Sequence, residues 1–293
     1  MTDYLLRSLM FVPAHNERLL DSSLRTDADV LLLDLEDSVQ PAEYKDIARK
    51  NIVRYLESGA FKNRQVFPRV NDRESGELLH DITTLALPGI DGFVYPKAKT
   101  GQDIYFFDKL LETVEYEQGI EIGTFKIIAL IETASAVLHA EEIAKASPRV
   151  IAIAFGNEDF LTDIQGENDE AASPLFTARS LISMAAHSAG VAPIDTVHIK
   201  VHDLEDLEYN LKIASKLGFQ GQLVLHPKEL PLVHRYFSPT DQEVNEAEEM
   251  VEAFKQSERE GVGVAIVNGK FVGPPLVRNA EKILRRKKLI DQK

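Results

Sequence analysis

The stretch VIAIAFGNED, residues 150–159, joins a short apolar run to an acidic end. Its first six residues are apolar and too few for a typical helix, as expected of a strand that is covered on both faces. Similar runs recur along the chain, with room for a helix between successive runs. They span residues 9–13, 30–35, 66–70, 92–95, 126–131, 195–199 and 222–225. Eight strands that alternate with helices predict an α/β fold, a parallel (β/α)8 TIM barrel.

Helix-like segments fill the intervals between these runs. They span residues 16–24, 42–58, 76–85, 101–116, 134–146, 174–189 and 204–217. In the last of them Leu204, Leu207, Leu211 and Ala214 recur every three to four residues, which gives a helix one apolar face. We therefore expect a catalytic barrel core over residues 1–235.

Residues 236–293 exceed what a barrel needs. They contain two more helical segments, 239–257 and 275–288, and between these segments two apolar runs flank Asn268-Gly269. An Asn-Gly pair between apolar runs is a strong hairpin signal. We expect the last barrel helix and a C-terminal hairpin-and-helix extension that serves as a lid or an oligomerisation arm.

Composition excludes several classes of protein. The chain of 293 residues has 33 Lys and Arg against 47 Asp and Glu, so its net charge is −14, which argues against a nucleic-acid partner. It has no Cys, which excludes disulfides, zinc–thiolate sites, iron–sulfur clusters and a Cys nucleophile. No apolar run reaches the roughly 18 residues of a membrane span, and the N-terminus does not resemble a signal peptide. We expect a cytoplasmic protein with no membrane partner.

Two carboxylates follow neighbouring predicted strands. Glu132 and Asp159 are 27 residues apart, about one strand–helix unit, and the active site of a (β/α)8 barrel forms where its strands end. Two carboxylates at one barrel mouth suit Mg²⁺, which binds oxygen ligands and keeps several waters. The alternative is that both residues only cap the helices that follow.

Arg69 ends another predicted strand, and a guanidinium there can bind a carboxylate through two parallel hydrogen bonds. The alternative is an ion pair with nearby acids. Asp34 and Glu36 would share one face of their strand, with Asp37 beyond its end. We interpret these acids as support for the metal or for Arg69, and the alternative is a polar turn with no catalytic role.

Three other polar residues follow predicted strands. Lys97 could form a Schiff base only if it were desolvated, and the acids inferred nearby favour a charged ion pair instead. His15 and His226 are candidate bases by residue type alone, and His226 precedes Pro227, where it could simply begin a helix. The sequence has no G-x-G-x-x-G, Walker A, G-x-S-x-G or H-E-x-x-H motif, so dinucleotide, nucleotide, serine-hydrolase and zinc-protease functions lack their usual support.

Six short motifs occur in order at the predicted strand ends. They are RSLMFVP at 7–13, LDLEDSV at 33–39, PRVN at 68–71, YPK at 95–97, LIET at 130–133 and FGNED at 155–159. Together they resemble the citrate lyase β-subunit-like (CitE-like) family of the HpcH/HpaI aldolase superfamily. The resemblance runs from Arg7 to about Pro227 and continues more weakly through 272–284.

The resemblance implies a Mg²⁺-dependent carbon–carbon lyase on a (β/α)8 barrel, often a homotrimer or hexamer. Its substrate would be a small carboxylated 3-hydroxyacyl thioester, similar to citryl-CoA or malyl-CoA, and its products a 2-oxo acid and an acyl thioester. By the same resemblance Glu132 and Asp159 would be the metal ligands, and Arg69 and Glu132 would bind substrate. Arg69, Glu36 and Asp37 would be the catalytic residues, the two acids holding metal waters and orienting Arg69.

One position departs from the family pattern. Some branches carry an acidic Asp shortly before a Pro in the C-terminal hairpin, whereas residues 269–275 here read GKFVGPP, with Gly273 in that place. The usual proton carrier is therefore absent, and Arg7 is only one candidate contact for a CoA phosphate. Two alternatives stay open: a pyruvate-type aldolase acting on a 4-hydroxy-2-oxo acid, with His15 or His226 as base, or a non-catalytic metabolite-binding barrel.

Overall fold

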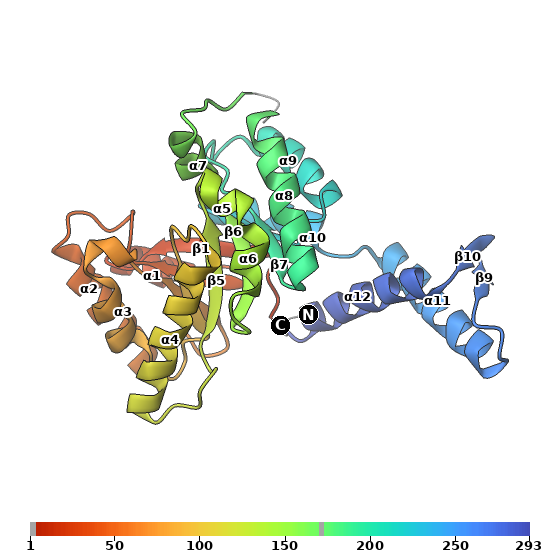
Figure 1. Cartoon of the computed structure of the whole chain (residues 1–293), viewed down its shortest axis with the longest axis horizontal. Coiled ribbons are helices and arrows are strands. Elements are labelled where there is room, and N and C mark those ends of the chain that lie inside the picture. Colours follow the sequence, from red (N-terminus) through yellow and green to blue (C-terminus); the bar gives the residue numbers. More distant parts are fainter. Residues whose placement is uncertain (1–3, 170–172) are drawn as a thin grey trace. The chain divides into compact units, whose positions relative to one another are not determined.

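A computed structural model describes residues 4–169 and 173–293. Eight parallel strands close into one barrel in the order β1 to β8, and helices surround the strands (Figure 1). The strands are β1 (Ser8–Pro13), β2 (Val30–Asp34), β3 (Gln65–Arg69), β4 (Gly92–Tyr95), β5 (Lys126–Ile131), β6 (Val150–Phe155), β7 (Ala192–Asp195) and β8 (Gly221–Val224). The predicted (β/α)8 barrel is confirmed.

Helices connect successive strands. The α-helices of this part are α1 (Glu17–Ser23), α2 (Tyr44–Glu57), α3 (Leu78–Leu85), α4 (Gly101–Gln118), α5 (Ala134–Leu138), α6 (Ala140–Lys145), α7 (Asn157–Asp163), α8 (Ser173–Ala189), α9 (Leu204–Lys216) and α10 (Leu230–Phe237). Two 3₁₀ turns, η1 (Arg73–Ser75) and η2 (Pro227–Glu229), follow β3 and β8. None of the helices in the described ranges is long and apolar enough to cross a membrane.

Two expected elements differ from the structure. The strand expected over 195–199 is β7 at Ala192–Asp195, which begins soon after Gly190 turns the chain out of α8 with a φ of 75°. Pro193 obscured this strand, because proline supplies no N–H to a ladder. The single helix expected over 134–146 is split into α5 and α6 at His139, whose φ of −106° and ψ of 15° are not helical.

Strand register explains how the barrel mouth becomes polar. Asp34 pairs with Pro13 on one side and with Arg69 on the other, so the last residues of β2 and β3 lie side by side. Two residues earlier, Leu32 and Phe67 pair in the same register and are fully buried. Because side chains alternate along a strand, this apolar layer lies directly beneath the Asp34–Arg69 layer.

The described chain divides into two compact units: Leu6–His234, and Arg235–Lys293 together with Tyr4 and Leu5. In the second unit α11 (Asp241–Arg259) and α12 (Pro274–Asp291) pack with the hairpin β9 (Ala265–Val267) and β10 (Lys270–Val272). Asn268 and Gly269 have φ values of 50° and 73°, as the tight turn of such a hairpin requires, so the predicted hairpin is confirmed. Its role as a lid or an oligomerisation arm remains a prediction.

The apolar core of this second unit is small. It consists of Ala247, Val251, Phe254, Val267, Val272, Val277 and Ala280.

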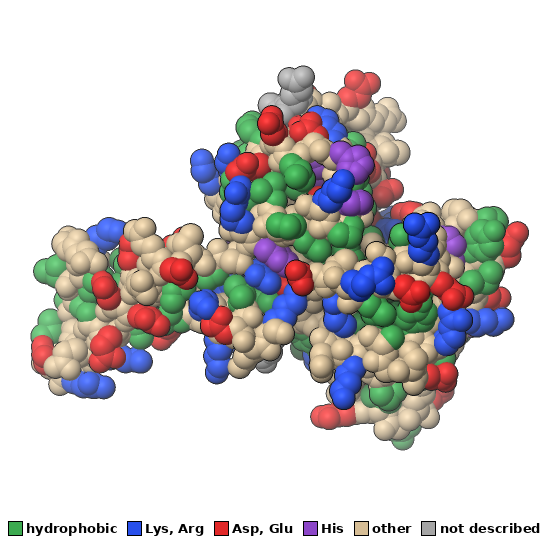
Figure 2. All heavy atoms as spheres, turned by 180° about the vertical axis from the view of Figure 1, so that it is seen from behind, with side chains coloured by type: hydrophobic (Ala, Val, Ile, Leu, Met, Phe, Trp, Pro, Cys, Tyr) green, Lys and Arg blue, Asp and Glu red, His purple; other side chains and the backbone are tan. Residues whose placement is uncertain are grey.

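On the face of the molecule that Figure 2 shows, acidic and basic side chains are interspersed.

Candidate functional site

A cavity of about 700 Å³ lies where the barrel strands β3 to β6 end. Its lining includes Glu132 and Thr133 after β5, Lys97 after β4, and Asp159 in the first turn of α7. The remaining lining residues are Asp72, Arg73, Glu74, Ser75, Tyr95, Pro96, Lys99, Asp103, Thr162 and Asp163. The two carboxylates predicted from spacing to bind Mg²⁺ thus share one cavity.

Glu132 has a buried carboxylate that accepts a backbone hydrogen bond and forms no ion pair in the described part of the chain. Glu132 is only 3% exposed. Its Oε2 accepts a hydrogen bond of 2.8 Å from the backbone N–H of Lys97. Burial, together with the nearby carboxylate of Glu36, raises the pKa of Glu132 to about 8. A cation beside this group would reverse the shift by stabilising the ionised form.

Helix capping does not account for Glu132. The cap of α5 is Thr133, whose hydroxyl accepts from the N–H of Ala136 at 3.1 Å, and Asp163 accepts from the N–H of Ala134 at 2.8 Å. The N-cap of α7 is Gly156, which has no side chain to serve as a cap. The capping alternative is therefore wrong for Glu132.

The donor set fits a magnesium ion. Within residues 4–169 and 173–293, no group of three or more His, Asp or Glu side chains is placed to hold a metal. Glu132 and Asp159 are two oxygen donors in one cavity, and their charges are close enough that Asp159 contributes to the raised pKa of Glu132. Mg²⁺ is commonly held by one or two carboxylates, with water or substrate completing its ligands.

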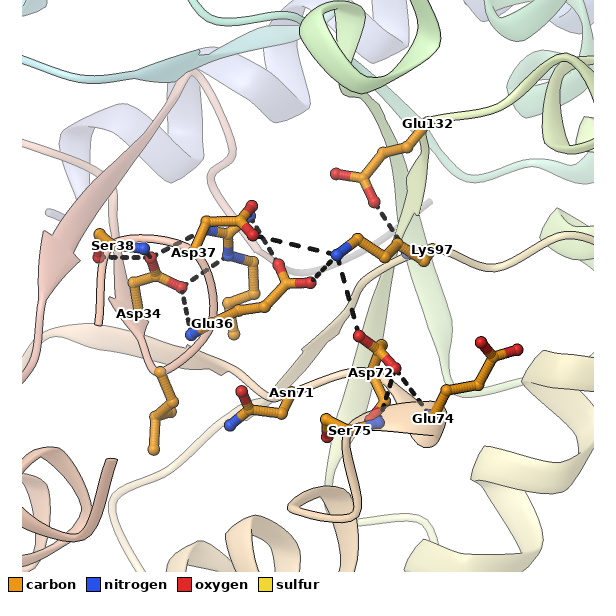
Figure 3. A network of polar contacts seen from close by, with 12 residues as sticks. Asp34, Glu36, Asp37, Ser38, Asn71, Asp72, Glu74, Ser75, Lys97 and Glu132 are labelled. Atoms are coloured by element: carbon orange, nitrogen blue, oxygen red, sulfur yellow. Dashed lines mark hydrogen bonds and ion pairs between the residues drawn. The ribbon is translucent and has the colours of Figure 1, made fainter. Parts of the chain in front are cut away.

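Arg69 forms ion pairs with three acids, Asp34, Glu36 and Asp37. These three acids lie close together in Figure 3. The Nε and Nη2 of Arg69 donate to the two oxygens of Asp34 at 2.7 and 2.8 Å. Its Nη1 lies 3.0 Å from Glu36 Oε2 and 3.2 Å from Asp37 Oδ2. The ion-pair alternative that the sequence left open is therefore confirmed. Because Nε and Nη2 both bind Asp34, Nη1 is the nitrogen of Arg69 that could also contact a substrate.

The pKa values of the acids around Arg69 shift in opposite directions. Burial opposes ionisation of Asp34, but the Arg69 guanidinium outweighs it and holds the pKa of Asp34 below its usual value. Burial dominates at Glu36 and raises its pKa to about 7, although Arg69 and Lys97 both act against that rise. The sequence offered no reason to assign Asp34 a separate role, because only the strand register shows which acid takes the fork of Arg69.

Lys97 joins the Arg69 group to the cavity. Its Nζ lies 2.8 Å from Glu36 Oε1, and 3.9 and 3.8 Å from the carboxylates of Asp37 and Asp72. Burial favours the neutral amine, but these carboxylates outweigh it and raise the pKa of Lys97. The ammonium stays charged, which supports the expected ion pair and disfavours Schiff-base chemistry.

The two candidate histidines are not among the residues that line this cavity. The ring of His15 stacks on Tyr44 with centroids 5.4 Å apart, and its Nδ1 is buried without a hydrogen-bond partner in the described part of the chain. His226 is the N-cap of η2, where its Nδ1 accepts from the N–H of Lys228 at 3.1 Å. For His226 the structure shows the capping role that the sequence left open.

Arg7, the candidate contact for a CoA phosphate, lies away from this cavity. Arg7 precedes the first residue of β1, at the opposite end of the strand from the cavity, and its Nε and Nη2 each donate to Asp29 at 2.8 Å. Arg7 thus forms a buried ion pair with Asp29. Gly273 is the N-cap of α12 in the second unit, with φ of −114°.

Fold and site together define a (β/α)8-barrel enzyme whose mouth gathers carboxylates around Arg69 and Lys97. Comparison with known proteins gives the family. Residues 7–227 match HpcH/HpaI aldolase/citrate lyase, and the chain belongs to this family. It is therefore a carbon–carbon lyase of the citrate lyase β and malyl-CoA lyase type, as the resemblance implied.

Two named relatives align over nearly the whole chain. The chain is 34% identical to the citrate lyase subunit beta of Haemophilus influenzae, over 96% of this chain and 97% of that protein. It is 29% identical to the L-malyl-CoA/beta-methylmalyl-CoA lyase of Rhodobacter capsulatus, over 96% and 94%. Both lyase types are thus similar to this chain.

Solved structures agree with the fold. Protein CitE from Mycobacterium tuberculosis, in complex with magnesium, acetoacetate and coenzyme A, superposes with a TM-score of 0.70 at 25% identity, over 98% of this chain and all of that one. A citrate lyase from Burkholderia xenovorans superposes with a TM-score of 0.83 at 21% identity, over 97% and 92%, which shows the fold alone.

Proposed function

We propose that this protein is a Mg²⁺-dependent lyase that cleaves a carboxylated 3-hydroxyacyl thioester, similar to citryl-CoA or malyl-CoA, to a 2-oxo acid and an acyl thioester. The observation that carries the proposal is the pairing of Glu132 and Asp159 in one cavity beside the Arg69–Lys97 group. The magnesium and coenzyme A bound by the Mycobacterium tuberculosis relative support the same chemistry.

The reaction needs two proton movements and one bond cleavage. The substrate hydroxyl loses its proton, the bond between the hydroxyl-bearing carbon and the α-carbon of the thioester breaks, and the α-carbon gains a proton. No oxidant or reductant is required. A Mg²⁺ ion held by Glu132 and Asp159 would supply Lewis-acid stabilisation of the negative charge that develops on substrate oxygens.

The chain's own residues bind and orient the substrate. Arg69 would contact the substrate carboxylate through Nη1, while Asp34 fixes the other edge of the guanidinium. Glu36 lies between Arg69 Nη1 and Lys97 Nζ, so it holds both cations in place at the mouth. Asp37, whose side chain is 55% exposed, is the acid of this group that substrate or metal waters would meet first. Fixed geometry of this kind lowers the entropic part of the barrier.

The source of the second proton differs from the pattern of some relatives. Gly273 cannot titrate, so a barrel residue or water must protonate the α-carbon. A barrel that lacks a dedicated acid is still expected to cleave, but more slowly, since positioned acid–base catalysis contributes about 10²–10⁴-fold.

A substrate panel tests the proposal. Purified protein is incubated with malyl-CoA, citryl-CoA and a 4-hydroxy-2-oxo acid, each with Mg²⁺ and with EDTA. We expect release of a 2-oxo acid from at least one thioester with Mg²⁺ and none with EDTA. Cleavage of the 4-hydroxy-2-oxo acid alone would establish the aldolase alternative, and no cleavage of any substrate would favour the metabolite-binding alternative.

The remaining expectations concern the state of the protein in the cell. We propose a cytoplasmic homotrimer or hexamer that acts on a small-molecule substrate. Multi-angle light scattering of the full chain tests the assembly: a mass near three or six times 32.8 kDa is expected, and a monomer would contradict it.

A further inference from the structure

Glu132 is held from both sides by the strands that flank its own. β5, which Glu132 follows, lies between β4 and β6 in the barrel. We propose that Lys97 after β4 and Gly156 after β6 are positioning residues, which together fix the carboxylate of Glu132 in the orientation that binds the cation. The inference rests on the proposed function, because it assigns a purpose to a metal ligand.

Gly156 leaves the space that the Glu132 side chain occupies. Its φ of −102° and ψ of 91° are extended values that any residue can adopt, so backbone freedom does not explain a glycine here. A Cβ on Gly156 would lie 2.6 Å from Cγ and 2.8 Å from Oε1 of Glu132, closer than real Cβ contacts. Any larger residue must therefore displace the Glu132 side chain or the backbone of β6.

The backbone at Gly156 has little room to move. Its N–H donates to the carbonyl of Ile131 at 3.0 Å, which continues the β5–β6 ladder to the site itself. The N–H of the next residue, Asn157, donates to the hydroxyl of Thr196 at 3.2 Å. An added methyl group would thus act mainly on the side chain of Glu132.

The backbone of Lys97 directs a hydrogen-bond donor at Glu132. It has φ of 53°, a left-handed conformation that is uncommon for a residue other than glycine. In this conformation its N–H donates to Glu132 Oε2 at 2.8 Å, while its Nζ reaches Glu36 Oε1 at 2.8 Å on the other side (Figure 3). The ion pairs of the side chain hold a backbone conformation that would otherwise be unfavourable.

Together the two residues make the oxygens of Glu132 unequal. Oε2 is occupied by the Lys97 N–H, whereas Oε1 lies against Gly156 and has no hydrogen-bond donor in the described part of the chain. Oε1 is therefore the oxygen available to a cation, and its position depends on the missing Cβ of Gly156.

Magnesium titration by calorimetry tests the steric part. We expect Gly156→Ala to weaken Mg²⁺ binding at least tenfold, with a circular dichroism spectrum like that of the wild type. Gly166→Ala is the matched control, because its Cβ would meet the Ile164 side chain at 3.1 Å and the end of the Leu161 side chain at 3.5 Å. This control should keep wild-type affinity. Wild-type affinity in Gly156→Ala would overturn the steric role.

A second pair of variants tests the backbone part and does not depend on the folding of Gly156→Ala. Lys97→Gly and Lys97→Val both remove the ammonium, but only glycine accepts φ of 53° without strain. Lys97→Gly should bind Mg²⁺ as tightly as the wild type or more tightly, since a positive charge is lost while the N–H stays in place. Lys97→Val should bind at least tenfold more weakly than Lys97→Gly, and equal affinities would overturn the role of the backbone.

Glu132→Gln separates this inference from the proposed function. If the wild type binds Mg²⁺ and Glu132→Gln does not, while the Gly156 and Lys97 variants match their controls, the metal site stands and the positioning roles are wrong. If the wild type binds no Mg²⁺, the metal assignment fails and the inference fails with it.

Discussion

Arg69 gives its two-nitrogen edge to Asp34 and keeps only Nη1 for other partners. The two bonds, 2.7 and 2.8 Å long, join the ends of β2 and β3, which are neighbours in register at these two residues. Arg69 as a whole residue is 8% exposed. Its guanidinium carbon lies over the ring of Phe11, 4.8 Å from the ring centroid. Asp34 thereby orients Nη1, the nitrogen that would meet a substrate carboxylate under the proposed function.

Replacement of Arg69 by lysine should impair both stability and turnover. Arg69→Lys keeps the charge but loses the two-point contact with Asp34, because an ammonium cannot reproduce the planar fork. We expect a loss in the free energy of unfolding on the order of 2 kcal/mol, and at least a tenfold fall in kcat/KM. Urea unfolding and steady-state kinetics measure the two effects.

The exposed Arg54–Glu17 pair provides the control. Its contact distance is 2.8 Å, similar to that of Arg69 with Asp34, but both of its side chains are more than half exposed. Arg54→Lys should change stability by no more than ~0.5 kcal/mol, as is usual for surface pairs. A wild-type kcat/KM in Arg69→Lys would show that the fork is not the reason for arginine at this position.

The response of the protein to Mg²⁺ should depend on pH. Burial raises the pKa of Glu36 to about 7 and that of Glu132 to about 8, both above the usual value of 4.5. Between pH 4.5 and 8 the folded state therefore binds more protons at these groups than the unfolded state, so they make stability fall as pH rises. Mg²⁺ binds the ionised form, and the increase in Tm on adding Mg²⁺ should be larger at pH 8.5 than at pH 6.

Thermal unfolding at both pH values, with and without Mg²⁺, checks this expectation. Glu132→Gln should lose most of the pH dependence of the Mg²⁺ effect, because the amide does not titrate. A Tm increase that is the same at pH 6 and pH 8.5 in the wild type would mean that no buried carboxyl is coupled to the metal.

Gly273→Asp asks whether the absent acid limits the reaction. The φ of −114° at Gly273 is open to any residue, and a Cβ there would meet only Phe271 Cε1 at 3.4 Å and Pro275 Cδ at 3.9 Å. The substitution should therefore fold normally. If the new carboxylate reaches the α-carbon, deuterium exchange into acetyl-CoA in the presence of a 2-oxo acid should rise by about 10²-fold or more, within the range of positioned acid–base catalysis.

The wild type is the informative comparison for this variant. Exchange in the wild type that is already as fast as cleavage would show that another acid is in place. The missing-acid hypothesis would then be wrong, and His15, Glu36 and Asp37 would become the candidates.

The barrel could be predicted from the sequence because each strand is a short apolar run followed by polar residues. That pattern survives without tertiary information, since a strand buried on both faces needs apolar residues throughout. It placed β7 too far along the chain, over 195–199 instead of Ala192–Asp195, because Pro193 interrupts the apolar signal of the true strand. It also missed the break between α5 and α6, which no glycine or proline marks.

That Glu132 and Asp159 share one cavity could be predicted from the sequence, but the contacts of the residues around them could not. Spacing alone placed Glu132 and Asp159 together, because consecutive strands of a barrel end at the same face. The fork between Asp34 and Arg69 depends on strand register, and the roles of Lys97 and Gly156 depend on a backbone angle and on a space. None of these three features leaves a signal in residue type or periodicity.

Mg²⁺ binding by the wild type, Glu132→Gln and Asp159→Asn is the decisive measurement, since the proposed reaction depends on these two carboxylates. Isothermal titration should give one site per chain in the wild type and at least tenfold weaker binding in each variant. Loss of 2-oxo acid release from the thioester substrate should accompany it, with unfolding free energies close to that of the wild type. Unchanged Mg²⁺ affinity in both variants would contradict the assignment of the metal site, and with it the proposed mechanism.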